Sequence, residues 1–121
     1  MREPPRFFIL FERGIILDKI VIGAANAYKE LYFFNPEFKG LPKEIQNEIQ
    51  IICVTVANST HGIFIMGFHK NGNVYIETQG EDLDASYDDI GAELEVKRVL
   101  KENDALIKAL HIWFTTIYLG E

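Results

Sequence analysis

The residues best suited to chemistry are two histidines, a nearby pair of hydroxyls and one glutamate. His61 directly follows Ser59 and Thr60, and His69 and Glu77 come later in the chain. A metal site needs three or four converging ligands, and nucleophilic catalysis needs a hydroxyl or thiol beside a base. Adjacent side chains in an extended segment point apart, so residues 59–61 are better explained as a polar turn. The sequence therefore predicts no catalytic residue and no metal site.

An acidic stretch is the most uneven feature of the charge distribution. It contains no Lys or Arg and holds Glu81, Asp82, Asp84, Asp88, Asp89, Glu93 and Glu95. It lacks the alternating ligands, central glycine and terminal glutamate of an EF-hand calcium loop. The formal charge of −6, from 12 basic and 18 acidic side chains, argues against binding to nucleic acid or anionic lipid. A basic partner is allowed by this charge but is not implied by it.

The remaining composition narrows the class of protein further. No Walker loop or dinucleotide fingerprint occurs, so we expect no nucleotide cofactor. The one cysteine, Cys53, excludes an intramolecular disulfide, and its apolar neighbours predict a buried side chain. The apolar runs at 7–11 and 15–17 are too short for a signal-peptide core or a membrane span. We expect a cytoplasmic protein that acts away from membranes.

The first half of the chain predicts a strand followed by a helix. With 121 residues and 48% hydrophobic content, the chain can form one core without disulfides or structural metal ions. Ile20-Val21-Ile22 is typical of a strand. Residues 24–34 stay open between helix and strand, because small and charged residues come first and aromatic ones last. Pro42 and the apolar spacing after it favour a helix at about 42–58, with a strand at 51–56 as the competing interpretation.

Asn71-Gly72 predicts a β-hairpin at about 62–79, since this dipeptide favours tight turns between strands. A two-residue turn would place Phe68 opposite Tyr75 and Met66 opposite Glu77. One face would then carry Ile63, Ile65, Val74 and Ile76, and the other Phe64, Met66, Phe68 and Tyr75. In that register His69 and Glu77 point to opposite faces. Both faces of the hairpin are apolar, so each needs a cover, either a helix or another protein.

A helical C-terminal third is predicted at about 86–119. Ser86 and Asp89 resemble a capping box, and Asn103 or Asp104 can cap a last helix that Gly120 ends. That last helix carries apolar residues on two sides, including Phe114 and Tyr118. One core cannot cover both sides, so the helix is expected to be sandwiched or partnered. The fold class is therefore α+β, with an antiparallel sheet centred on the hairpin.

Several segments of the chain resemble a small uncharacterised family of clostridial-type bacterial proteins. They are Gly23-Ala24-Ala25-Asn26-Ala27-Tyr28, Tyr32-Phe33-Phe34-Asn35-Pro36-Glu37-Phe38, Leu41-Pro42-Lys43-Glu44-Ile45, Tyr87-Asp88-Asp89-Ile90-Gly91 and Tyr118-Leu119-Gly120-Glu121. The resemblance implies a compact intracellular domain at 19–121 and transfers no catalytic residue. Residues 1–18 lie outside it and are either a native appendage or edge strand, or the product of a mis-set start near Leu17.

These features favour a non-catalytic module that binds a protein partner or a second copy of itself, such as a homodimer. The residues predicted to make the contact are Phe64, Met66, Phe68, Tyr75, Phe114 and Tyr118. The alternative is an enzyme, metal-binding or small-ligand protein with a pocket between sheet and helices. That alternative would use His61, Glu77 or the acidic stretch, and it requires these groups to converge.

Overall fold

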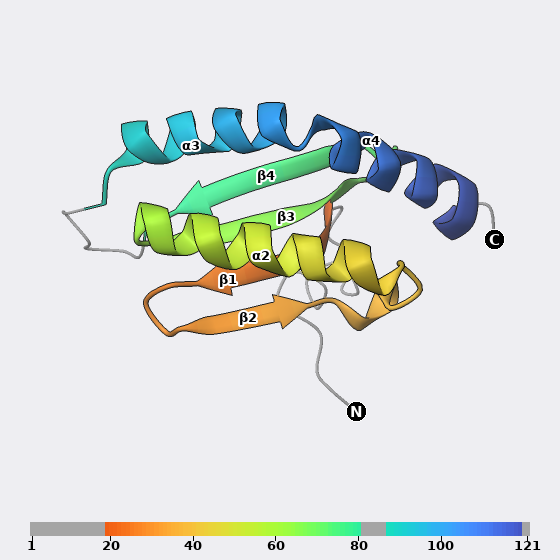
Figure 1. The fold of residues 1–121 in the computed structure, drawn as a ribbon, viewed down its shortest axis with the longest axis horizontal. Helices are drawn as coiled ribbons and strands as arrows, with labels where there is room; N and C mark the ends of the chain where they lie inside the picture. Colours follow the sequence, from red (N-terminus) through yellow and green to blue (C-terminus); the bar gives the residue numbers. More distant parts are fainter. Residues whose placement is uncertain (1–18, 81–86, 120–121) are drawn as a thin grey trace.

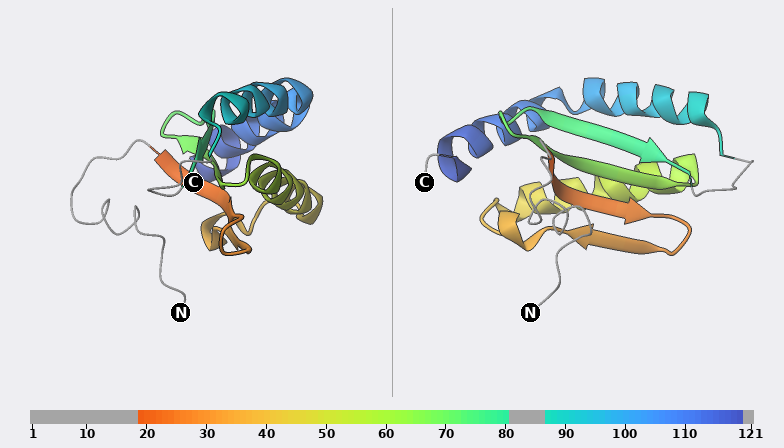
Figure 2. Two further views of the ribbon diagram at one scale, coloured as in Figure 1. Left: turned by 90° about the vertical axis from the view of Figure 1, so that its left-hand side faces the viewer. Right: turned by 180° about the vertical axis from the view of Figure 1, so that it is seen from behind.

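A computed structural model describes residues 19–80 and 87–119 of the chain (Figure 1). Within these ranges the chain forms a four-stranded antiparallel sheet in the order β2-β1-β3-β4. Figure 2 shows the helices α2, α3 and α4 gathered on one side of this sheet. The predicted α+β class is confirmed. The predictions for residues 1–18, for Ser86 and for Gly120 lie outside the described ranges.

The first two strands form a hairpin that settles the open question over residues 24–34. Strand β1 spans Lys19–Asn26 and β2 spans Leu31–Phe34. The strand interpretation is therefore correct for the aromatic residues at 32–34. Between them, Glu30 adopts a left-handed φ of 53° and the Asn26 side chain accepts a hydrogen bond from the Lys29 N–H. The residues favourable to helix thus extend β1 or lie in its turn, because strand pairing outweighs local propensity.

Asn35 joins this hairpin to the helical layer. Its side-chain amide donates to the Val21 carbonyl at 2.8 Å, and its backbone N–H donates to the Ile22 carbonyl at 2.8 Å. Its side-chain oxygen accepts from the Glu37 N–H and caps the short 3-10 helix η1, Pro36–Phe38. Asn35 is buried, so these bonds satisfy polar groups that water cannot reach.

Helix α2, Lys43–Thr60, confirms the helical interpretation of the segment after Pro42. It buries Ile49, Cys53 and Val56 against the sheet. A Cβ on Gly23 would lie 3.3 Å from Ile49 Cγ2, so the glycine lets the helix approach β1 closely. The predicted burial of Cys53 is also confirmed, and burial raises the pKa of its thiol to about 12.

The second hairpin is confirmed, but its predicted register is wrong by one residue. Strands β3, Ile63–His69, and β4, Val74–Gln79, pair Phe68 with Val74 and Met66 with Ile76. The loop has three residues instead of two, since the His69 N–H donates to the Asn73 carbonyl at 2.7 Å. Gly72 supplies the left-handed conformation that this longer turn requires, with φ 91°.

The C-terminal third folds as helix α3, Asp89–Glu102, helix α4, Asp104–Trp113, and a π-helical turn η2, Phe114–Tyr118. Asp88 caps α3 by accepting a 3.0 Å hydrogen bond from the Gly91 N–H. Asn103 precedes α4, but its side-chain amide donates back to the Val99 carbonyl of α3 and provides no side-chain cap to α4. The predicted position of the cap at Asn103 is therefore confirmed, although its side chain does not bond to α4.

One core fills the space between the helices and the face of the sheet that they cover. It is richest in aromatic rings where η1, β3 and η2 meet. The Phe68 and Phe114 ring centroids lie 4.3 Å apart, and those of Phe38 and Phe68 lie 5.4 Å apart. Tyr118 packs at the margin of this cluster, 4.9 Å from Phe114. The last helical segment is thereby fixed to the sheet along one side.

Candidate functional site

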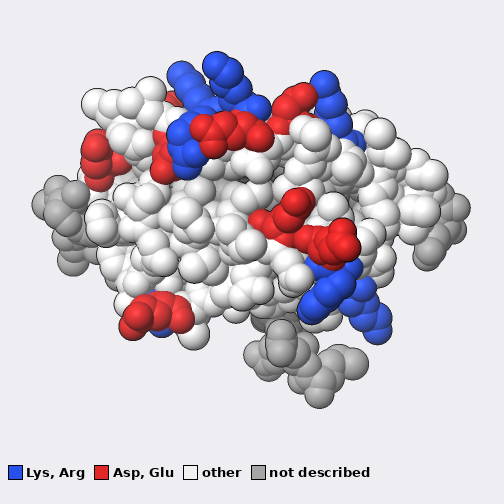
Figure 3. Space-filling model, viewed as in Figure 1, with Lys and Arg blue, Asp and Glu red and all other residues white. Residues whose placement is uncertain are grey.

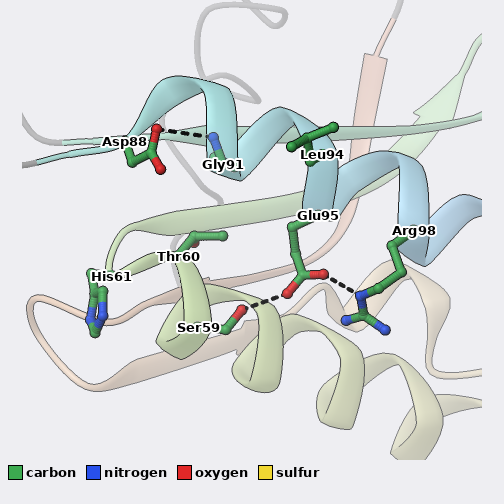
Figure 4. Close-up of a pocket in the computed structure, with 9 residues that line it drawn as sticks. Ser59, Thr60, His61, Asp88, Gly91, Leu94, Glu95 and Arg98 are labelled. Atoms are coloured by element: carbon green, nitrogen blue, oxygen red, sulfur yellow. Dashed lines mark hydrogen bonds and ion pairs between the residues drawn. The ribbon is translucent and has the colours of Figure 1, made fainter.

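A groove lies between the C-terminal end of α2 and the first half of α3 (Figure 4). Its volume is about 390 Å³. The polar residues that line it are Ser59, Thr60, His61, Asp88, Glu95 and Arg98. The fold thus brings the predicted ligand residue His61 together with Ser59 and Thr60, which end α2 as helix and do not form the predicted polar turn.

At the centre of the groove, polar side chains are joined by hydrogen bonds and ion pairs. The Ser59 hydroxyl donates to Glu95 at 2.9 Å, and Arg98 forms ion pairs with Glu95 and Glu102. The hydrogen bond from Arg98, followed by that from Ser59, lowers the pKa of the Glu95 carboxyl. Glu95 is therefore ionised at neutral pH and is a weak base. Because Ser59 faces a carboxylate of low basicity, this pair does not provide an activated nucleophile.

His61 lines the same groove without joining that set. Figure 4 shows its imidazole at one end of the groove and Arg98 at the other. His61 ends α2 in a left-handed conformation with φ 56°. Near it, the Asp88 carboxylate is engaged in capping α3. The groove therefore collects polar groups but does not align a nucleophile with a base.

Glu77, the second predicted ligand, lies on the opposite face of the sheet, where it pairs with Lys19. Most of the acidic stretch, residues 81–86, lies outside the described ranges. Among the residues that the structure describes, no group of three or more His, Cys, Asp and Glu side chains is placed to hold a metal ion. The predicted ligands thus do not form one site.

Four of the six predicted contact residues belong to the core. Phe64, Met66, Phe68 and Phe114 are at most 1% exposed, so they cannot form a contact surface. The physical reason is that the helices cover the face of β3 on which Phe64, Met66 and Phe68 lie, and Phe114 packs into the same core. Tyr118 is partly exposed, and its hydroxyl donates to Glu37 at 3.3 Å.

Tyr75, the remaining predicted residue, marks the other face of the sheet. The strand registers place Ala24, Phe33, Ile63, Ile65 and Tyr75 together there, from all four strands. Each of these side chains is partly exposed. We call this surface the open face, because no helix or strand within 19–80 and 87–119 lies over it (Figure 2). An antiparallel sheet normally carries polar residues on an uncovered face, and this one carries apolar residues at its centre.

Polar side chains frame one end of the open face. Lys19 Nζ lies 2.9 Å from Glu77 Oε1 and 5.0 Å from the centroid of the Tyr75 ring. The His69 and Tyr75 rings are 5.2 Å apart. Burial, with a smaller contribution from Glu77, raises the pKa of the Tyr75 phenol, so it stays neutral. The open face thus combines an apolar centre with a polar rim, as protein contact surfaces do.

Tyr75 lies across Gly67, the glycine in the middle of β3. A Cβ on Gly67 would lie 2.6 Å from Tyr75 Cε1 and 2.5 Å from the Ile20 carbonyl oxygen. Only a glycine leaves room for the ring at this position. The alternation of Ile63 and Ile65 with Phe64 and Met66 was visible in the sequence, whereas the loop length that puts Tyr75 on the face of Ile65 was not.

The helical side of the molecule differs from the open face. Large apolar side chains are exposed there too, among them Ile51 at 64% on α2, the neighbours Ile90 at 74% and Leu94 at 62% on α3, and Ile112 at 61% on α4. Figure 3 shows that charged side chains on this side form distinct groups with uncharged surface between them. These side chains come from three different helices, whereas the apolar residues of the open face come from paired strands of one sheet.

Residues 19–121 match a family of unknown function (DUF6145), and the chain belongs to that family. No curated protein and no solved structure has detectable similarity to the chain. Within the described part of the chain, no helix combines the length and the apolar character needed to cross a bilayer.

Proposed function

We propose that this chain is a non-catalytic protein-interaction module whose contact surface is the open face. The observation that supports this proposal is the set of apolar side chains from four strands on a surface that no described element covers. Removing such a surface from water is favourable by about 25 cal/mol per Å² of apolar area. A partner that covers it would gain this free energy without rearranging the core behind it.

The partner is expected to be a protein in a bacterial cytoplasm. The formal charge of −6 disfavours nucleic acid and anionic membranes, because both would repel an acidic chain. The Lys19–Glu77 pair and His69 give the rim of the open face groups that can form hydrogen bonds with a protein. Catalysis has less support, because the Ser59 hydroxyl faces an ionised carboxylate.

A small-ligand function in the groove between α2 and α3 is the second candidate. The observation in its favour is the 390 Å³ volume with His61, Asp88 and Arg98 along its walls. If the groove binds a metabolite, a panel of polar metabolites should raise the unfolding temperature of the wild type and of Ile65→Glu equally. Arg98→Ala should abolish that rise.

The proposed function is tested by placing a charge on the open face and an identical charge elsewhere. Ile65→Glu alters the centre of the open face, while Ile51→Glu alters an exposed isoleucine on the outer side of α2. Light scattering at micromolar concentration, with partner capture by the purified variants, compares their binding. We expect Ile65→Glu to fold and to lose protein binding at least tenfold, and Ile51→Glu to behave as the wild type.

The proposal would be overturned by an open face that makes no protein contact. That result is a wild-type chain that stays monomeric, captures no protein and is unaffected by Ile65→Glu. Circular dichroism of both variants keeps the comparison valid by showing that each has the wild-type secondary structure.

A further inference from the structure

We infer that the exposed side of the first half of α3 is a docking site for a basic amphipathic helix of a partner protein. This site adds a second contact surface to the molecule and does not depend on the open face. Three observations support it. They are two exposed apolar side chains one helical turn apart, a groove beside them and an excess of negative charge around them.

The apolar part of the site is formed by Ile90 and Leu94. The residues that α3 buries are the smaller Ala92 and Val99, whereas Ile90 and Leu94 are 74% and 62% exposed. Residues four apart lie on the same side of a helix, so these two side chains form one apolar strip. The packing of α3 on the rest of the molecule leaves this strip in water. A partner that covers it would gain the free energy of apolar burial.

The groove between α2 and α3 lies along one edge of the apolar strip. Leu94 lines it together with Ser59 and Thr60 at the end of α2 (Figure 4). Its volume of about 390 Å³ gives the side chains of another protein room beside Leu94. Amphipathic helices bind in this way, with apolar residues three or four apart placed in a groove. A helix is therefore the shape of partner that suits the strip and the groove together.

Negative charge makes a basic partner the best match. The acidic stretch holds seven Asp and Glu residues and no Lys or Arg. Asp88 caps α3 and Asp89 lies in its first turn, where a negative charge favours the helix dipole. Glu93 lies beyond that turn, is exposed and forms no ion pair with any described residue. The stability of the helix thus explains the first two charges and does not explain Glu93.

The helical period places these charges beside the apolar strip. Asp89 and Glu93 each precede a residue of the strip, so they flank it on the side away from the groove. Their carboxylates would attract Lys and Arg side chains of a partner and repel an acidic one. Lys97 and Lys101 continue the same side of α3 towards its C-terminal end, so the site is limited to the first half of the helix.

Binding of a synthetic peptide to the full chain tests this site. The probe is a labelled helical peptide with Leu at every third or fourth position and Lys at most others. The same peptide with Glu in place of Lys is its control. Fluorescence anisotropy at low salt measures both affinities. We expect the Lys peptide to bind at least tenfold more tightly than the Glu peptide.

Substitutions in the chain show whether the peptide occupies the apolar strip. Ile90→Lys should weaken binding of the Lys peptide at least tenfold, and Leu94→Lys repeats the test if Ile90→Lys does not fold. Ile112→Lys adds the same charge at a residue of α4 that is 61% exposed, and it should change the affinity less than about twofold. Glu93→Gln should weaken binding more than Glu48→Gln, which removes the same charge from the exposed side of α2.

Equal effects of Ile90→Lys and Ile112→Lys would show that the peptide responds to net charge alone and would overturn the inference. A Lys peptide that does not bind would also overturn it. If Ile65→Glu weakens peptide binding and Ile90→Lys does not, the peptide binds the open face, so the α3 site is wrong and the proposed function gains support. If Ile90→Lys abolishes peptide binding while Ile65→Glu changes no protein contact, the α3 site stands and the proposed function fails.

Discussion

Phe64 and Ile65 are neighbours in β3 that point to opposite faces of the same sheet. Phe64 is buried under the helices with Met66 and Phe68, and Ile65 lies on the open face between Ala24 and Glu77. The two faces have similar apolar character, but only one has a described cover. Apolar patterning therefore shows which residues need burial and does not show whether the chain itself provides it.

The largest expected difference between the faces is in stability. Phe64→Ala leaves a cavity in the core and should reduce the free energy of unfolding by about 3–5 kcal/mol. Ile65→Ala should cost less than about 1 kcal/mol in the isolated chain, because its side chain is already partly exposed. Urea unfolding at low protein concentration, followed by fluorescence of the single tryptophan, Trp113, measures both values. Equal losses would show that the open face is part of the folding core.

The next-largest effect on stability is expected at Asn35, which joins the first hairpin to the helical layer. Asn35→Ala removes the donor to the Val21 carbonyl and the acceptor for the Glu37 N–H at a buried position. Leaving such groups unpaired should cost about 2–3 kcal/mol. Asn47→Ala on the exposed side of α2 is the control and should change stability by less than about 0.5 kcal/mol. The same urea titration compares them, and a small loss for Asn35→Ala would remove its assigned role.

A smaller effect on stability is expected from adding a Cβ at Gly67, where the Tyr75 ring lies against the backbone. A Cβ at Gly67 meets the Ile20 carbonyl as well as the Tyr75 ring, so Gly67→Ala should destabilise by about 1–3 kcal/mol and displace the ring from the open face. At Gly40 the nearest atom, Trp113 Cζ2, is 3.7 Å away, so Gly40→Ala is a matched control. Thermal unfolding compares the two variants. Near-identical melting temperatures would mean that the position of the Tyr75 ring does not require a glycine at residue 67.

Secondary structure was predictable where residues close together in the sequence determine it. Pro42 followed by Ile45, Ile49 and Val56 was sufficient for α2, and Asn71-Gly72 was sufficient for the second hairpin. Residues 24–34 could not be decided, because their strands are stabilised by pairing across β1 and β2 and not by local propensity.

The candidate site was less predictable, because a single residue of loop length decides which side chains share a face. Gly72 in a left-handed conformation turns a two-residue loop into a three-residue one and reverses the partners of β4. That shift placed Val74 and Ile76 on the face of Phe64 and Phe68 and left Tyr75 on the other face. The groove was also invisible in the sequence, since Ser59 and Glu95 meet only through the packing of α2 on α3.

The smallest expected effect concerns the groove on the helical side. The hydrogen bonds from Arg98 and Ser59 lower the folded-state pKa of Glu95, so their contribution is present above the unfolded pKa and is lost as pH falls through the folded value. Because these groups are near water, Glu95→Gln should cost less than about 1 kcal/mol at pH 7. The difference from wild type should disappear towards pH 3. Urea midpoints across this pH range measure it, and a pH-independent difference would contradict the ionic origin.

The central claim is that the open face is a protein contact surface, and solvent accessibility of methyl groups tests it most directly. A soluble paramagnetic agent broadens the methyl resonances of exposed isoleucines, so Ile65 can be compared with Ile51 in one sample. In the protein complex that light scattering or partner capture identifies, we predict that Ile65 is protected and Ile51 is not. In the free chain, broadening of Ile65 should rise towards that of Ile51. Broadening of Ile65 that is the same in the free and the complexed chain would contradict the claim.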